Sequence, residues 1–229
     1  MKHSLLFKAL LGAFFGGLLF VGFGAFAVHA ASPAVFISWK AQSYVPASFQ
    51  GKVLPTASSS FSASVEVIDG GKLADISKQT IYWYADDEFL GGGAGTQAIT
   101  FSGPSRSPNL INLRVQIPGY AGGMLIKAVE IPIMNPEVVI ESPYPAHAFS
   151  SSPVAVAVLP YFFHVHDLSK LTINWIMNGA PPENPLNPQI LTINTNVQPE
   201  TTIPISVSVV NADDFLDSAS ADTFLIFRQ

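Results

Sequence analysis

Four aspartates near the C-terminus come closest to metal chemistry in residue type and spacing. They are Asp213, Asp214, Asp217 and Asp222, and they follow the last long apolar run. Calcium is held in proteins by carboxylate and carbonyl oxygens gathered in a loop. The run lacks the glycine and the terminal glutamate of an EF-hand loop. We keep the four as calcium candidates beside the simpler interpretation of a hydrophilic hairpin tip, and we expect no required cofactor.

The His164-Val165-His166 segment is a second group with metal-ligand character. Alternate side chains of an extended chain point the same way, so the two imidazoles would share one side, beside Asp167. Zinc binds such pairs, but a site needs further ligands, and none is evident in the sequence. The matching segment before Asp75 has no histidine. We therefore predict a solvated or capped loop and no metal site.

Three motifs could suggest catalysis. Ser77-Lys78 and Ser169-Lys170 have the residue types of a Ser–Lys pair, but each serine follows an aspartate at i−2 that can fix a turn. The glycine-rich residues 91–95 lack the Lys-Ser/Thr of a phosphate-binding loop, so we predict a turn between strands. Gly-x-Ser-x-Gly and His-Glu-x-x-His do not occur. The sequence predicts no catalytic residues and no enzyme.

Composition narrows the class of protein. Apolar residues make up 48% of the chain and charged residues only 12%, against about 25% charged in average proteins. Cysteine is absent, which excludes disulfides and thiolate metal sites. Residues 31–135 carry seven basic and seven acidic side chains, whereas residues 136–229 carry two and nine, a net charge of −7. No basic cluster lies beyond the N-terminus, so nucleic acid is not an expected partner.

The N-terminal segment predicts export. Lys2 and Lys8 precede twenty uncharged residues, 9–28, and Val28-His29-Ala30 places small residues where signal peptidase reads. The run also reaches the roughly 20 residues that span a bilayer. We therefore expect residues 1–30 to be a signal peptide cleaved after Ala30, with an uncleaved anchor in the cytoplasmic membrane as the alternative. In both cases the rest of the chain is extracellular or at the cell surface.

The body of the chain is a repeat. "DISKQTIYW" begins at Asp75 and "DLSKLTINW" at Asp167, 92 positions later. Two further blocks match at the same offset: residues 98–101 with 190–193, and the alternating run 111–117 with 203–209. Three blocks in one register indicate two copies of one unit. We predict two domains, residues 31–135 and 136–229.

Alternation of apolar and polar residues predicts an all-β fold. In the first copy the expected strands are 35–39, 61–67, 80–84, 97–101, 111–117 and 125–133. In the second copy they are 138–141, 154–159, 172–177, 189–193, 203–210 and 222–227. Short strands at this spacing, with a tryptophan on the third, are typical of an antiparallel sandwich of immunoglobulin type.

Each third strand is followed by a characteristic turn, Asp86-Asp87 after "TIYW" and Asn178-Gly179 after "TINW". This order resembles the W-x-x-(D/N)-G hairpin of bacterial PKD-like and Ig-like repeats, and the ending "VVNADDFLDSASADTFLIF" is similar to their last two strands and turn. Asp87 departs from the pattern, which has glycine there. The resemblance covers both copies and implies two tandem Ig-like (PKD-like) β-sandwich domains in a secreted or surface protein.

The same resemblance has two further consequences. Since no cysteine pair joins the sheets, Val65 and Val115 are expected to fill that space against Trp83. The whole layout is also similar to small envelope proteins of minimal-genome bacteria, some of them linked to pilus-like assemblies. This resemblance implies a non-catalytic spacer, adhesion or assembly module, and association with a pilus is among the roles that it suggests.

Two regions are candidate binding sites. If Ile81 and Trp83 face the core, then Tyr82 and Tyr84 face outward, and Arg114 and Gln116 of a neighbouring strand do likewise. Tyrosine and arginine are enriched at binding patches, although packing between strands would also explain them. The second region is a long loop found in the first copy alone, with Trp39, Tyr44 and Phe49, which could serve recognition or cover the end of the sandwich.

These observations leave two functions open. The first is a surface module that binds a protein of the cell envelope through the Tyr82 face. The second is an accessory protein that binds cell-wall polysaccharide or sugar through the same tyrosines and the aromatic loop.

Overall fold

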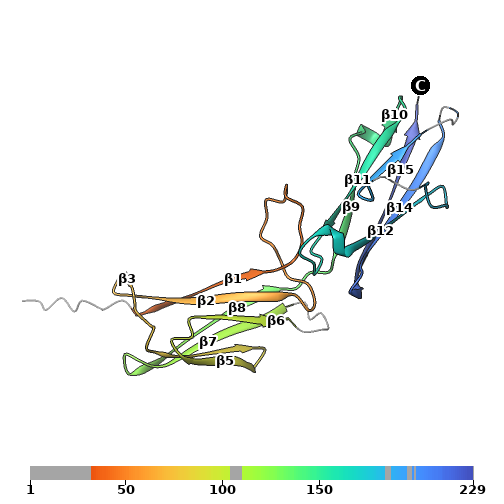
Figure 1. Cartoon of the computed structure of the whole chain (residues 1–229). Helices are drawn as coiled ribbons and strands as arrows, with labels where there is room; N and C mark the ends of the chain where they lie inside the picture. Colours follow the sequence, from red (N-terminus) through yellow and green to blue (C-terminus); the bar gives the residue numbers. More distant parts are fainter. Residues whose placement is uncertain (1–31, 104–109, 184–186, 195–197, 199, 229) are drawn as a thin grey trace, which may run out of the picture. The chain divides into compact units, whose positions relative to one another are not determined.

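The structure is a computed structural model that describes residues 32–103, 110–183, 187–194, 198 and 200–228 (Figure 1). The predicted signal or anchor segment, including residues 9–28, lies outside the described residues. Among the residues that are described, no helix is both long and apolar enough to cross a membrane.

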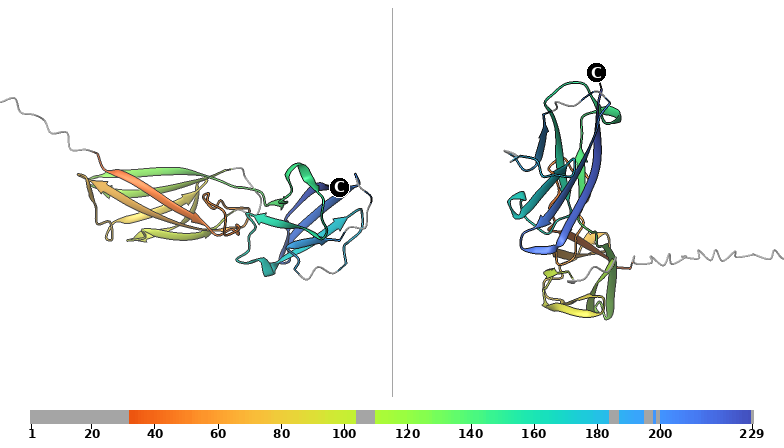
Figure 2. Two further views of the ribbon diagram at one scale, coloured as in Figure 1. Left: turned by 90° about the horizontal axis from the view of Figure 1, so that it is seen from above. Right: turned by 90° about the vertical axis from the view of Figure 1, so that its right-hand side faces the viewer.

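The first repeat folds as two facing antiparallel sheets (Figures 1 and 2). Its strands are β1 (Ala34–Ala41), β2 (Ser60–Asp69), β3 (Lys72–Leu73), β4 (Thr80–Ala85), β5 (Glu88–Ala94), β6 (Ala98–Ser102), β7 (Leu110–Tyr120) and β8 (Gly123–Pro132). One sheet has the order β1-β2-β3, with β6 also paired to β2, and the other has the order β5-β4-β7-β8. Thus β1, β2 and β6 lie in one layer and face β4, β7 and β8 in the other. This corresponds to strands A, B and E facing strands C, F and G, which is the immunoglobulin arrangement.

Period-two alternation builds the core of this sandwich. Every second residue is buried from Phe61 to Val67 in β2, from Ile81 to Trp83 in β4 and from Ile111 to Ile117 in β7. Trp83 is 0% exposed and shares one core cluster with Val65 and Val115, as predicted. Burying apolar surface at about 25 cal/mol per Å² is the main stabilising term for a chain without disulfides.

The second repeat has the same plan. Its elements are β9 (Glu137–Glu141), η1 (Pro145–His147), β10 (Ala148–Phe149), β11 (Val154–Tyr161), η2 (Leu168–Lys170), β12 (Leu171–Met177), β13 (Ile190–Ile193), β14 (Thr202–Asn211) and β15 (Asp214–Phe227). The sheets have the orders β13-β11-β9 and β10-β15-β14-β12, antiparallel except for the short parallel pair β10–β15. Trp175 lies in its core, 4% exposed. Both repeats are therefore all-β Ig-like sandwiches.

The repeated word has the same structural role in both copies. The carboxylates of Asp75 and Asp167 accept bonds from the backbone N–H of Ser77 and Ser169, at 3.0 and 2.8 Å. These bonds fix the turn that leads into the tryptophan strand, as predicted.

The glycine-rich segment differs from its prediction. Residues 91–94 belong to strand β5, which pairs with β4, and the segment is not a turn. A Cβ on Gly92 would lie 2.3 Å from the carbonyl oxygen of Ile81 and 2.7 Å from Cδ1 of Tyr82. Glycine is thus required at this position because the backbone of β4 and the Tyr82 ring leave no room for a side chain. β5 adds a strand beside β4, whereas within the described residues of the second repeat β12 is the last strand of its sheet.

The long loop of the first repeat, residues 42–59, contacts the second repeat. The N–H of Tyr44 donates to the carbonyl oxygen of Phe163 at 2.7 Å, and the carbonyl of Tyr44 accepts from the N–H of Phe162 at 2.7 Å. The ring of Tyr44 packs against the second core. The ring of Phe49 meets those of Tyr161 and Phe162 edge-on, with centroids 5.9 and 5.7 Å apart. The loop is therefore an ordered strap onto β11 and its C-terminal end.

Candidate functional site

Strand β4 presents two tyrosines on the outer face of the first sandwich. Ile81 and Trp83 are each 0% exposed, whereas Tyr82 and Tyr84 point the other way and are half-buried. This is the orientation that the sequence predicted. It follows from alternation along a strand whose inner face contacts the core.

Strand β7 places a polar pair opposite the tyrosines. In the β4–β7 ladder Tyr84 faces Arg114 and Tyr82 faces Gln116. The guanidinium carbon of Arg114 lies 4.6 Å from the centroid of the Tyr84 ring, within the range of a cation–π contact. The structure therefore brings together four of the predicted binding residues.

Phe89 of β5 is a fifth member that the sequence did not predict. It pairs with Tyr84, its ring centroid is 5.6 Å from that of Tyr84 and 6.1 Å from that of Tyr82, and it is 56% exposed. Because residues 91–95 were interpreted as a turn, no strand was predicted there. The signal that could have found it is the Asp86-Asp87 pair, since Asp and Gly pairs favour two-residue hairpin turns. We define the aromatic–arginine face as Tyr82, Tyr84, Phe89, Arg114 and Gln116.

Strand β8 extends this face with apolar side chains. Gln116 pairs with Ile126 and Pro118 with Met124, so these residues project from the same side of the sheet. Ile126 is 54% exposed and Met124 is 57% exposed. Tyrosine, arginine, phenylalanine and methionine are the residue types that protein interfaces favour.

The turn between β4 and β5 contributes a carboxylate. Asp86 and Asp87 have φ of +46° and +72°, a conformation that is costly for residues other than glycine. Oδ1 of Asp86 accepts from the N–H of Asn112 at 2.8 Å, and Oδ1 of Asp87 lies 2.9 Å from Nη2 of Arg114. Asp87 stands where the repeat pattern has glycine. It thus holds the guanidinium of Arg114 by an ion pair, while the Tyr84 ring contacts the same group.

Trp39 and Tyr44, the other predicted binding residues, do not join this face. Trp39 lies on β1 in the opposite sheet, half-buried against the first core, with Nζ of Lys52 3.4 Å from its ring centroid. Tyr44 packs on the second repeat, and this burial raises the pKa of its phenol.

The four calcium candidates do not gather at one point. Asp214, Asp217 and Asp222 lie along strand β15 and not in a turn. Of the four aspartates, Asp213 alone lies in the turn, so the hairpin tip is shorter than predicted. Asp214 and Asp222 pair with Asn211 and Ser206 of β14, five residues apart, so at about 3.3 Å per residue they are about 17 Å apart along the sheet. Asp217 is buried and accepts from the N–H of His164 at 2.9 Å. Within the described residues, no group of three His, Asp or Glu side chains could hold a metal ion.

The Ser–Lys motif has a structural role in the second copy. Nζ of Lys170 lies 3.1 Å from Oδ2 of Asp213. The hydroxyl of Ser169 donates to Asp167. The serine and the lysine are thus each engaged with a different aspartate.

Comparison with known proteins adds solved structures of related fold. No family model matches the chain, and no curated protein matches it. The fibronectin(III)-like modules of CbhA from Clostridium thermocellum are 10% identical, with a TM-score of 0.30, over 85% of this chain and 95% of theirs. The Ig1-2 module of the Drosophila receptor protein tyrosine phosphatase DLAR is 13% identical, with a TM-score of 0.27, over 86% of this chain and 99% of that one.

A third neighbour is SGBP-B of the Bacteroides ovatus mixed-linkage glucan utilization locus, solved with a mixed-linkage heptasaccharide. It is 14% identical, with a TM-score of 0.25, over 86% of this chain and 47% of that one. Similarities this low concern the fold alone. What the site does must be argued from its own residues.

Proposed function

We propose that this chain is an exported, non-catalytic binding module that attaches to a protein of the cell envelope through the aromatic–arginine face. The observation that carries the proposal is the arrangement around Arg114. Its guanidinium lies on Tyr84 and beside Asp87, at the centre of a sheet face that also exposes Phe89 and Ile126. An arginine held in this way loses little side-chain entropy on binding.

The second repeat supports this proposal as an internal comparison. At the offset of 92, Tyr82, Tyr84, Arg114 and Gln116 correspond to Asn174, Ile176, Ser206 and Ser208. Both repeats have the same core plan, so the sandwich itself does not require tyrosine or arginine at these positions. The first repeat is thus the binding module, and the second is a spacer or assembly element.

The geometry favours a protein over a sugar as the partner. A sugar ring stacks best on an open aromatic face, but the Tyr84 ring already has Arg114 over it. Phe89 is inclined to the rings of Tyr82 and Tyr84 by 64° and 60°, so the three rings form no flat platform. Cell-wall polysaccharide is therefore the second candidate.

The test is binding of the full chain to intact cells and to isolated envelope fractions. We expect the Tyr82→Ser/Tyr84→Ser variant to keep its melting temperature, because surface substitutions change stability little, and to lose attachment. The matched control is Asn174→Ser/Ile176→Ser, which should attach like the unmodified protein. Attachment by the tyrosine variant at full strength would refute the proposal.

The same assay separates the two partner classes. Protease treatment of the envelope fraction should abolish attachment if the partner is a protein. Attachment that survives protease and is competed by soluble wall oligosaccharides would establish the sugar alternative.

A further inference from the structure

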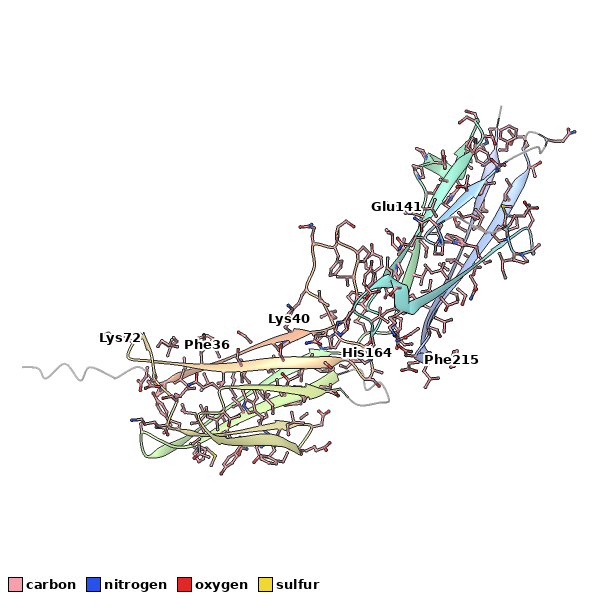
Figure 3. The ribbon with its side chains drawn as sticks, in the orientation of Figure 1. Phe36, Lys40, Lys72, Glu141, His164 and Phe215 are labelled. Carbon is pink, nitrogen blue, oxygen red and sulfur yellow. The ribbon has the colours of Figure 1, made fainter. Side chains whose placement is uncertain are left out.

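The hairpin between β14 and β15 has an irregular end that exposes two large apolar side chains. Val210 pairs with Ser218 and Asn211 with Asp214, so residues 215–217 have no partner in the ladder. A bulge of this kind re-aims side chains. Phe215 is 79% exposed and Leu216 is 88% exposed, although neighbours in a regular strand would point to opposite faces. Figure 3 shows Phe215 at this end of the strand. We call these two residues the Phe–Leu tip.

The third residue of the bulge anchors the tip. Asp217 turns inward and is 6% exposed. Its Oδ2 accepts from the N–H of His164 and from Nδ2 of Asn211, both at 2.9 Å. Oδ1 of Asp214 accepts from the N–H of Leu216 at 3.0 Å. The apolar pair is therefore held in place before any partner arrives, which lowers the ordering cost of binding.

The first repeat shows that the fold does not need this device. There Pro118 pairs with Met124 across residues 119–123, whereas Val210 pairs with Ser218 across residues 211–217. Val210 corresponds to Pro118 at the offset of 92, so the second hairpin is two residues longer (seven against five). The extra length carries the bulge.

The surroundings of the tip are acidic. A hollow of about 460 Å³ beside it is lined by Asp167, Asp213 and Asp214, by Lys170, and by His164 and His166. Nζ of Lys170 lies 3.1 Å from Oδ2 of Asp213. With histidine counted as neutral, three aspartates against one lysine leave a net negative charge next to the apolar pair. This agrees with the net charge of −7 over residues 136–229.

We propose that the Phe–Leu tip is a second docking surface, which inserts into an apolar pocket of a partner protein whose rim carries lysine or arginine. Exposed apolar side chains with a polar rim mark interaction sites, and the acidic hollow beside the tip complements a basic side chain of the partner. A lipid surface is disfavoured, since the anionic headgroups of cell membranes would repel this charge.

The experiment is photo-crosslinking of the full chain in the cells that make it. Phe215→p-benzoylphenylalanine keeps an aromatic ring at the tip. We expect a discrete protein adduct, attached within a few residues of a lysine or arginine of the partner. The same probe at Phe36, an aromatic residue 53% exposed on β1 of the first repeat and outside the aromatic–arginine face, is the matched control and should not give that adduct.

Charge and site dependence decide the outcome. Adding Asp213→Asn/Asp214→Asn to the probe variant removes both charges and keeps an Oδ1 acceptor for the N–H of Leu216. It should strongly weaken the adduct while the melting temperature is retained, and Tyr82→Ser/Tyr84→Ser should leave the adduct intact. No adduct, an adduct insensitive to removal of these charges, or one mapped to an acidic surface would overturn the proposal. Because the tyrosine variant tests the aromatic–arginine face separately, failure of one proposal does not imply failure of the other.

A membrane partner is tested directly with vesicles. The full chain is floated with phosphatidylcholine vesicles, with and without phosphatidylglycerol. We expect no flotation that depends on the tip. Flotation lost in Phe215→Ser/Leu216→Ser would assign the tip to lipid and overturn a protein partner.

Discussion

Arg114 lies over the ring of Tyr84, with its guanidinium carbon 4.6 Å from the ring centroid. The contact joins neighbouring strands of one sheet face, and Asp87 completes it from the adjoining turn at 2.9 Å. A cation–π contact is worth about 0.5–1 kcal/mol at an exposed site, and an exposed ion pair about 0–1 kcal/mol. Their main effect is thus to hold one arginine geometry ready for a partner.

The first prediction separates orientation from stability at Asp87. Asp87→Gly removes the ion pair, at a cost of about 0–1 kcal/mol. It also removes an unfavourable backbone conformation worth about 1–2 kcal/mol, because glycine accepts a φ of +72°. We expect the free energy of unfolding in urea to stay equal or rise slightly. Attachment to the envelope fraction should weaken about three- to tenfold, a tenfold loss corresponding to about 1.4 kcal/mol.

The second repeat supplies the control for Asp87. Gly179 occupies the same turn position with φ of +78°, and Ser206 stands where the first repeat has Arg114. Gly179→Asp should destabilise by about 1 kcal/mol, since no cation repays the strain. Stability changes of equal size and opposite sign would show that the ion pair with Arg114 does not compensate the backbone strain at Asp87.

Much of the fold could be predicted because its main signals are local. Alternation of apolar and polar residues placed Trp83 inside and Tyr84 outside, and the offset of 92 predicted two copies of one sandwich. The indole N–H groups confirm that register. Trp83 donates to the carbonyl of Thr96 at 2.9 Å, and Trp175 to that of Pro188 at 2.8 Å, each thirteen residues downstream.

What could not be predicted depends on contacts distant in sequence or on unusual backbone. Strand β5 was not predicted because glycine has low strand propensity. Its use at Gly92 is explained by the close approach of the Ile81 carbonyl and of Tyr82 on the neighbouring strand. The packing of Tyr44 on the second repeat was not predicted, because no local sequence pattern indicates that a loop of one repeat packs on the other. The Phe–Leu tip escaped because a bulge breaks the alternation on which the prediction depended.

The second prediction tests the two cores. Trp83→Ala and Trp175→Ala should each destabilise their own repeat by roughly 3–5 kcal/mol, the cost of removing a core aromatic side chain. Trp83→Phe retains most of the packing and loses the bond to Thr96, so it should cost about 1 kcal/mol for that bond, beyond any loss of packing. Urea unfolding measures all three. In a Trp39→Phe background, quenching by acrylamide as fast as that of free indole would contradict burial of the remaining tryptophans.

The third prediction concerns the strap. An isolated fragment of residues 136–229 lacks the Tyr44 ring and its two backbone bonds, so it should be less stable than the same repeat in the full chain by about 2–4 kcal/mol. Tyr44→Ala in the full chain should lower the stability of the second repeat by a large part of that difference. The control Gln50→Ala, on an exposed loop side chain, should change nothing. A fragment as stable as the repeat in the full chain would show that the strap contributes no stability.

The last prediction concerns the anchor of the tip. Burial raises the pKa of Asp217 above 3.8, its value in the unfolded chain, despite the opposing hydrogen bonds from Asn211 and His164. The folded state therefore binds this proton more tightly than the unfolded state does. Stability from the protonated carboxyl is present below pH 3.8 and is lost as the pH rises through the folded pKa.

Asp217→Asn removes this titration. Asp75 and Asp167 have the opposite effect, because hydrogen bonds from Ser77 and Ser169 lower the pKa of each carboxyl. The stability that these two carboxylates contribute is present above pH 3.8 and is lost as the pH falls through the folded pKa. Asp75 and Asp167 are present in both the unmodified protein and the Asp217→Asn variant, so their contributions cancel when the two stabilities are subtracted. The stability of the unmodified protein minus that of Asp217→Asn should fall as the pH rises from 3.5 and then level off above the folded pKa. NMR signals of β14, followed through urea titrations at each pH, measure this difference for the second repeat, and parallel curves would mean that Asp217 titrates alike in the folded and unfolded states.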